Sequence, residues 1–365
     1  MGVAVRVLAL DIGVGTCDVL LYDSGRRLEN CTRMVLPSPT RLLAARVEEA
    51  AARGDIFVTG HTVGGGPFSR AVRRALAAGR KVYMTPAAAL SIRNNLEDVA
   101  SLGIETVPSP PHGFTGTTVT ADELDLKPLA EFLTRHGEDI QDLDGVAVAV
   151  QDHGTYRVGE SNRKTRLAHM RARLEADPFP TALAFTSTEV TEVFPRLASA
   201  SRRLREQFPD CRVLVMDTSP AAVAGCLEDP VVAGCARGNL LLVNAGNGHT
   251  LACILSGGKV LGLLEHHTRR LDPGAFAGYL HLFCDGEARD EDPFMAEGHG
   301  LFYLAEPPGW GALDLIAVTG PNRGMLEGTG LDPYYPAPGG DMMMTGPMGL
   351  VSAYRQRSGG RAGRP

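Results

Sequence analysis

Runs of apolar residues alternate with amphipathic stretches along most of this chain. Three short runs at 6–11, 17–23 and 31–36 are typical of strands, and residues 40–52 have helical periodicity. Further strands are predicted at 56–59, 81–84, 145–150, 212–216 and 315–318, and further helices at 68–78, 87–101, 126–136 and 221–227. Strands that alternate with helices indicate an α/β fold whose sheet has parallel members.

One part of this pattern occurs twice. Residues 8–26 read LALDIGVGTCDVLLYDSGR, and residues 241–259 read LLVNAGNGHTLACILSGGK. Each copy has an apolar strand, a polar residue at its end (Asp11 or Asn244), a G-x-G turn, a second strand and a tight reverse turn. The repeat predicts two homologous halves whose loops could face one ligand. The glycines of the two turns are Gly13, Gly15, Gly246 and Gly248.

Loops of this kind have a simple chemistry. Glycine lacks a Cβ, so backbone N–H groups can approach an anion closely. An acid at the strand end can hold hydrated Mg²⁺ beside a phosphate, and Asp11 fits this role, with Thr16 able to donate its hydroxyl hydrogen to a phosphate oxygen. The alternative is a pair of ordinary glycine hairpins.

The length of 365 residues suggests two or three domains. We expect an N-terminal half at 1–225, with an inserted segment at about 100–205, and a C-terminal half at 226–354. Residues 160–208 are predicted to be mostly helical. Residues 108–120 are rich in Pro, Gly and Thr and are expected to form a loop. The polar, Gly-rich residues 355–365 are expected to be disordered.

Composition limits the kinds of partner and cellular compartment that we expect for this protein. The net charge is -6 and the bases are not gathered in a stripe, so no nucleic-acid partner is expected. No apolar run reaches the ~18 residues of a membrane span, and the start of the chain lacks a signal-peptide pattern. The seven cysteines are scattered. We therefore expect a cytoplasmic protein with reduced thiols and without a disulfide framework, zinc site or iron–sulfur cluster.

Two other motifs end predicted strands. HTVGGGP, at 61–67, either binds an anion at a helix N-terminus or is a flexible turn before Pro67. AVQDHG places Asp152 and His153 at a strand end, where α/β sheets bind ligands. The substrate-binding candidates are His61, Gly64, Gly65, Gly66 and His153.

Three adjacent polar residues, Glu265, His266 and His267, are of the types that bind metal ions. Neighbouring side chains on an extended segment point to opposite faces, so a polar strand end is favoured over a metal site. The MMM run at 342–344 is expected to pack in a core.

Taken with two further motifs, the repeat resembles the acetate and sugar kinase, heat-shock chaperone and actin superfamily. VLVMDTSPAAVAGCLEDP, at 213–230, resembles the segment that connects the halves in that superfamily, and AVTGPNRGML, at 317–326, resembles its adenosine loop. The resemblance implies two ribonuclease-H-like (actin-like ATPase) halves that close on ATP and Mg²⁺. It also implies Asp217 as the catalytic base, and the metal side of the site would then rest on Asp11 and Asp217. Asp152, at the end of another predicted strand, is the rival base.

The resemblance and the loops together assign a set of residues to the nucleotide. They are Asp11, Gly13, Gly15, Thr16, Asn244, Gly246, Gly248, His249, Thr250, Gly320, Asn322 and Arg323. Asn244 stands where many members of the superfamily have Asp, and it cannot supply a negative charge to a metal. His249 either donates a hydrogen bond to phosphate or packs against the turn.

The chain also contains the segments GNGHT, EHHT, VTGPNRG and GDMMMTG. These segments resemble the sequences of a poorly characterised prokaryotic family within this superfamily. That family is sometimes labelled pyruvate formate-lyase activating enzyme-like. A radical activating enzyme needs three closely spaced cysteines for its cluster, and this sequence has none so spaced. We therefore do not expect radical chemistry.

An ATP-dependent phosphotransferase acting on a small molecule is the first functional hypothesis. An ATPase switch acting on a partner protein and a non-catalytic nucleotide or metabolite sensor are the alternatives. ATP turnover with and without a pool of metabolites would distinguish them.

Overall fold

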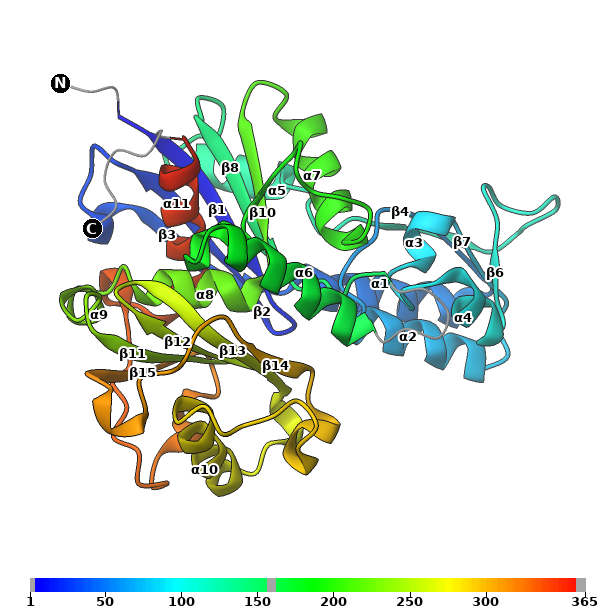
Figure 1. The fold of residues 1–365 in the computed structure, drawn as a ribbon. Helices are drawn as coiled ribbons and strands as arrows, with labels where there is room; N and C mark the ends of the chain where they lie inside the picture. The colour runs from blue at the N-terminus through cyan, green and yellow to red at the C-terminus, as the bar shows by residue number, and fades with distance from the viewer. Residues whose placement is uncertain (1–3, 156–161, 359–365) are drawn as a thin grey trace.

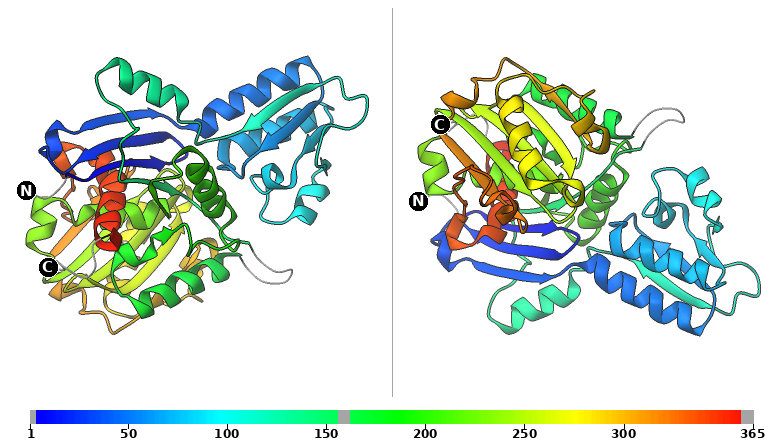
Figure 2. Two further views of the ribbon diagram at one scale, coloured as in Figure 1. Left: turned by 90° about the horizontal axis from the view of Figure 1, so that it is seen from above. Right: turned by 90° about the horizontal axis from the view of Figure 1, so that it is seen from below.

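The computed structural model describes residues 4–155 and 162–358, and Figures 1 and 2 show its course. Most predicted strands and helices are confirmed within a few residues. The C-terminal helix α11 (Thr345–Ser358) continues into the segment that was expected to be disordered, so residues 355–358 are helical. The rest of that segment, 359–365, lies outside the described residues.

The first half is built on a six-stranded sheet in the order β3-β2-β1-β8-β10-β9. Strands β1, β2 and β3 are antiparallel, whereas β8 and β10 run parallel to β1. Successive side chains of β1 enter different cores, with Val7 and Ala9 on one face and Leu8 and Leu10 on the other. The sheet is therefore buried on both faces, which explains its continuous apolar runs. The strands are β1 (Arg6–Ile12), β2 (Thr16–Asp23), β3 (Thr32–Pro37), β8 (Gly145–Val150), β9 (Phe185–Thr186) and β10 (Arg212–Met216).

The second half repeats this order in a five-stranded sheet, β14-β13-β12-β11-β15. Its strands are β11 (Asn239–Ala245), β12 (His249–Ser256), β13 (Lys259–His267), β14 (Gly300–Tyr303) and β15 (Leu315–Thr319). Strand β15 runs parallel to β11, as β8 does to β1. The hairpin strands also match in length, with seven residues in β1 and β11 and eight in β2 and β12. The fold is thus α/β with two ribonuclease-H-like halves, as predicted.

A third, all-parallel sheet of order β6-β5-β4-β7 forms a lobe that projects from the first half (Figure 1). Its elements are α1 (Pro39–Arg53), β4 (Ile56–Gly60), α2 (Gly66–Ala77), β5 (Val82–Met84), α3 (Pro86–Ala89), α4 (Leu96–Ser101), β6 (Ile104–Thr106) and β7 (Thr117–Ala121). This lobe occupies 39–121, whereas the inserted segment was expected at about 100–205, a range that includes the central strand β8. The domain boundary at 225/226 stays a prediction.

Three local predictions were wrong. The predicted loop at 108–120 contains β7, which pairs with β4 because Val119 and Ala121 enter the core of the lobe. The predicted helix at 87–101 is two helices, since Asn95 caps the second one. The segment 160–208 holds β9 between two long helices. The remaining helices are α5 (Lys127–Arg135), α6 (Asn162–Ala176), α7 (Pro195–Gln207), α9 (Pro230–Gly234) and α10 (Pro273–Cys284).

Two helices join the halves. Helix α8 (Thr218–Cys226) follows the first sheet, and α11 returns from the second half to pack on β1 and β8. They cross at Gly225 and Gly349, where an added Cβ would lie 1.7 Å from the Thr345 carbonyl oxygen and 1.8 Å from that of Ala221. This close crossing needs glycine on both helices. It packs the helix that follows the first sheet against the helix that returns from the second half.

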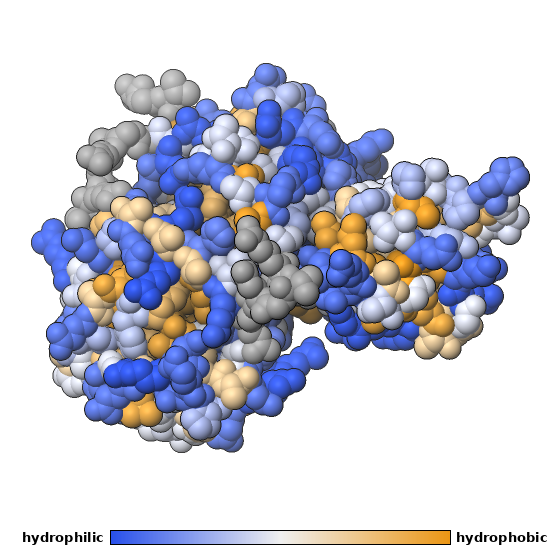
Figure 3. Space-filling view, turned by 45° about the vertical axis from the view of Figure 1, so that its right-hand side comes forward, coloured by the Kyte–Doolittle hydropathy of each residue, from blue (hydrophilic) through white to orange (hydrophobic). Residues whose placement is uncertain are grey.

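The described helices are all too short or too polar to cross a membrane. On the face drawn in Figure 3, hydrophilic residues cover most of the surface and hydrophobic residues appear in small groups.

Candidate functional site

The two repeated loops have the same backbone geometry. In the first, the Gly13 N–H donates to the Thr16 carbonyl oxygen at 2.9 Å, and in the second the Gly246 N–H donates to that of His249 at 3.0 Å. The loops also meet across the molecule, since a Cβ on Gly15 would lie 2.8 Å from Asn247 Nδ2. The turns therefore face each other across the junction of the halves.

A cavity of about 80 Å³ lies between these loops. Thr218 and Ser219, at the start of α8, also line it, as do Gly320 and Pro321 after β15 and Thr345 at the start of α11. All four motifs of the sequence analysis thus contribute to one small space. Of the residues assigned to the nucleotide, those that line it are Asp11, Gly13, Thr16, Asn244, Gly246, Gly248, His249 and Gly320.

The other assigned residues support this cavity from behind. Thr250 is fully buried and shares a hydrogen bond with Thr268, which in turn donates to the Gly246 carbonyl oxygen. The Asn322 side chain donates to the same oxygen at 2.9 Å. The Arg323 guanidinium lies 5.9 Å from the centre of the Tyr335 ring. These contacts brace the second loop.

Asp18, on β2, adds an acid that the sequence analysis missed. The register of the hairpin pairs it with Asp11, and both residues line the cavity. Burial raises the pKa of Asp18 to about 7, and burial together with Asp18 and Asp217 raises the pKa of Asp11 well above its usual range. An Oδ1 atom of each acid is buried without a hydrogen-bond partner among the described residues.

This acid pair fits a hydrated Mg²⁺. Its donors are hard carboxylate oxygens, two of them are orphaned, and a cation would relieve the repulsion between them. The second hairpin has Asn244 and Leu251 at the equivalent positions. Both carboxylates that line this cavity therefore come from the first half. The prediction that Asp217 is a Mg²⁺ ligand stays untested, and Asp217 does not line this cavity.

We expect Asp18→Asn to stabilise the protein in the absence of divalent cations, because burial raises the pKa of both acids and so makes them costly to bury at neutral pH. The gain should be on the order of 1 kcal/mol, or about 1 °C in Tm for a chain of this length. The same variant should lose the rise in Tm that Mg²⁺ gives the wild type. Thermal unfolding with and without Mg²⁺ measures both effects, and Asp23→Asn, at the other end of β2, is the control. A variant that is no more stable and still responds to Mg²⁺ would contradict the assignment.

A second cavity, of about 430 Å³, adjoins the first. Both are lined by Gly13, Val14, Gln151, Thr218 and His249. Its far wall is the 62–66 loop, which leads into α2. Its charged lining consists of one carboxylate, that of Asp152, and the guanidinium groups of Arg70, Arg73, Arg93 and Arg196. Together with the positive end of the α2 dipole, this excess of arginine favours an anionic ligand.

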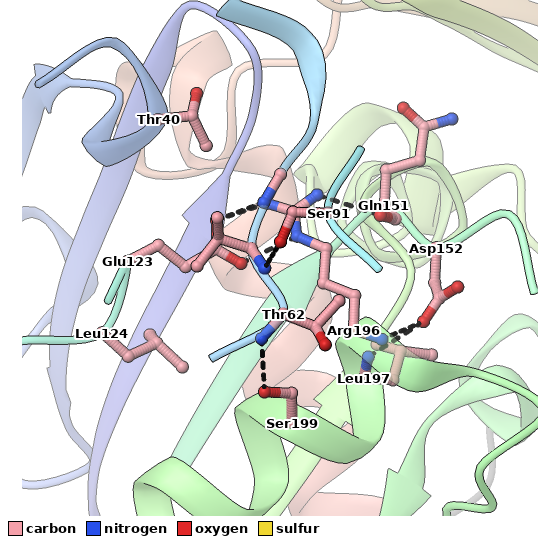
Figure 4. A network of polar contacts seen from close by, with 12 residues as sticks. Thr40, Thr62, Ser91, Glu123, Leu124, Gln151, Asp152, Arg196, Leu197 and Ser199 are labelled. Carbon is pink, nitrogen blue, oxygen red and sulfur yellow. Dashed lines mark hydrogen bonds and ion pairs between the residues drawn. The ribbon is translucent and has the colours of Figure 1, made fainter. Parts of the chain in front are cut away.

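A network around Arg196 fixes this wall (Figure 4). The guanidinium donates to both oxygens of the buried Glu123, at 2.7 Å each, and to the Gln151 carbonyl oxygen at 2.9 Å. Glu123 in turn accepts from the Gly64 N–H at 3.0 Å. Gly64, Gly65, Gly66 and His153 line the cavity. His61, the fifth candidate, is instead bound through its backbone N–H to Ala121 on β7.

The two candidate bases have different surroundings. Asp152 lines the second cavity and accepts hydrogen bonds from the backbone N–H groups of Gly154, Arg196 and Leu197 at 2.8–3.0 Å. Burial raises its pKa to about 6. These hydrogen bonds anchor the carboxylate at the start of α7.

Asp217 is more enclosed. It caps α8 through the Ser219 N–H, accepts from the Asp152 N–H at 3.2 Å, and forms an ion pair with Arg166 Nη2 at 3.0 Å. The same guanidinium contacts Glu265, which is fully buried. Asp217 lines a separate, smaller cavity together with Arg166 and Met170. Its contacts are those of a structural acid.

A family model described as "Putative pyruvate format-lyase activating enzyme (DUF1786)" matches residues 63–325. The match covers well over half of the chain, so the protein belongs to this family. No curated protein matches it.

Several solved structures have a similar fold. The protein Lmo2764 from Listeria monocytogenes, described as a putative N-acetylmannosamine kinase, is 9% identical with a TM-score of 0.35, over 97% of this chain and 100% of that one. The PilM–PilN type IV pilus biogenesis complex gives 13% identity and a TM-score of 0.38, over 96% and 98%. A putative sugar kinase from Cytophaga hutchinsonii gives 10% and 0.33, over 96% and 100%. Likenesses this distant assign no activity to this chain.

The family label leads to a prediction about iron–sulfur chemistry. The seven cysteines are scattered over the fold, and the four that lie in strands and helices, Cys17, Cys226, Cys253 and Cys284, are buried as free thiols. A cluster needs at least three thiolates at one point, so anaerobically purified protein should contain no acid-labile sulfide. Sulfide and iron analysis measures this directly. Near-stoichiometric sulfide with matching iron would overturn our interpretation of the cysteines.

Proposed function

We propose that this protein binds ATP with Mg²⁺ between its two halves and transfers a phosphoryl group to a small anionic molecule. The observation that carries the proposal is the junction of the two cavities. One is lined by both glycine loops and the acid pair, and the other by arginines, and five residues belong to both. A phosphate at the loops would therefore face a molecule held by the arginines.

In this proposal each group has a defined task. The backbone N–H groups of the two loops bind phosphate oxygens, and Asp11 and Asp18 hold the Mg²⁺, which neutralises phosphate charge when bound. The arginines orient the acceptor. Asp152 accepts the proton of the attacking hydroxyl, because it borders the acceptor cavity whereas Asp217 is held in the ion pair with Arg166.

The small volume of the first cavity bears on how ATP enters. About 80 Å³ accommodates a phosphate group with a metal ion rather than a whole nucleotide. In this proposal the halves part for ATP to bind and close again for transfer.

ATP turnover in the presence of fractionated metabolites tests this proposal. We expect ADP release to rise with a fraction of anionic small molecules and not with neutral ones. The double variant Arg70→Ala/Arg73→Ala should raise the acceptor concentration needed without changing nucleotide affinity. If ADP release is the same with every fraction, water is the acceptor and the ATPase switch is the better interpretation.

A further inference from the structure

Three histidines from distant parts of the chain meet at the rim of the second cavity. His153 follows β8, His249 begins β12, and His299 precedes β14. We call them the histidine cluster. One ring nitrogen from each lies within 4.8 Å of the others. The ring centroids of His249 and His299 are 4.5 Å apart, and that of His153 is 5.2 Å and 5.8 Å from them.

We infer that the histidine cluster is a binding site for a divalent transition metal of the zinc type, distinct from the Mg²⁺ site at the acid pair. Three imidazoles are the ligand set of open zinc sites, which keep a fourth position for water or substrate. His153 and His249 line the second cavity, so the fourth position would face the anionic ligand expected there.

One ligand of the cluster is enclosed and has an open ring nitrogen. His299 is only 6% exposed, and its Nε2 atom is buried without a hydrogen-bond partner among the described residues.

Two groups lie behind the rings. Glu265 Oε2 lies 4.0 Å from His299 Nδ1, and the Gln151 side-chain nitrogen contacts His249 Nδ1. A carboxylate that accepts a hydrogen bond from Nδ1 leaves the Nε2 lone pair for a metal, and Glu265 is the acid beside His299.

The cluster is looser than a loaded site. Ring nitrogens at about 2.0–2.1 Å from one zinc ion lie about 3.4 Å apart in tetrahedral geometry. Small rotations of the rings would close the difference. The site therefore needs no rearrangement of the backbone, and it does not depend on whether ATP is the ligand of the other cavity.

Metal titration of the full chain, stripped with chelator and kept free of nucleotide, tests this inference. We expect one equivalent of Zn²⁺ to bind, and Co²⁺ to give the visible absorption of a four-coordinate ion. His153→Gln and His299→Ala should each weaken binding by at least about 100-fold, more than the about 10–100-fold of an outer-shell change. His153 is partly exposed, so its variant should fold even if that of His299 does not.

Two controls separate this site from other sources of binding. His112→Ala, in an exposed loop, should bind Zn²⁺ as the wild type does. Asp18→Asn should also retain Zn²⁺, because the acid pair is not the site. Substoichiometric Zn²⁺ in the wild type, or affinity unchanged in both cluster variants, would overturn the inference. Failure of ATP binding would leave it intact.

Discussion

Replacing Gly248 by valine is expected to abolish ATP binding while leaving the fold intact. A Cβ at this position would meet no atom nearer than 3.8 Å, so the folded chain has room for a side chain. The methyl groups would, however, occupy the space that a phosphate needs to reach the loop N–H groups. Losing two hydrogen bonds to a charged group costs about 1.5–3 kcal/mol each, so affinity should fall by about 100-fold or more.

Gly278→Val is the matched control. Gly278 lies on the exposed face of α10, and an added Cβ there also has open space. Both variants should show circular dichroism and thermal unfolding close to those of the wild type, and only Gly248→Val should lose ATP by calorimetry. Equal affinity in the two variants would show that phosphate does not approach the second loop. Gly15→Val is a poorer test, because its Cβ would displace Asn247.

Asp152→Asn is expected to slow turnover by about 10²–10⁴-fold, the usual cost of removing a general base. The affinity of this variant for ATP should change little, since Asp152 lines the second cavity and not the first. The substitution also weakens the backbone hydrogen bonds at the start of α7. For that reason Tm and nucleotide affinity are measured beside kcat, and a loss of kcat alone supports a base.

Asp217→Asn is the comparison for this prediction. It removes one partner of the buried Arg166, and loss of a buried ion pair destabilises by about 3–5 kcal/mol when no second acid remains. Glu265 stays in place here, so we expect a smaller loss of stability and only a modest change in turnover. Abolished turnover in Asp217→Asn with normal turnover in Asp152→Asn would return the role of base to Asp217.

The repeat made the two halves predictable from the sequence. Two hairpins with strands of equal length and the same glycine turn are compatible with few other folds. The order of the four motifs along the chain indicated that these motifs meet at one cleft. Asp152 and Asp217 were both recognised as strand-end acids. We propose different roles for them because Asp217 is paired with Arg166. Arg166 lies on α6, which is distant in sequence, and no local pattern connects it to Asp217.

Other features needed the pairing of distant segments. Asp18 interrupts an apolar strand, and this was the one available signal, but only the register of the hairpin places it beside Asp11. The histidine cluster joins residues from three regions that no local pattern connects. The sequence drew attention to the adjacent His266 and His267, and His267 lies beside the cluster, with its ring centroid 4.3 Å from that of His299. Strand β7 was not predicted, because its segment is rich in Pro, Gly and Thr. Its partner strand β4 also lies more than fifty residues earlier in the chain, so no local pattern indicated the pairing.

Calorimetric titration of the wild-type chain with millimolar ATP, with and without Mg²⁺, tests the central claim most directly. We predict saturable binding of one ATP per chain that weakens when Mg²⁺ is withheld and is lost in Gly248→Val. Absence of any binding heat at millimolar ATP and Mg²⁺, in protein shown to be folded, would contradict the assignment of a nucleotide site to the cleft.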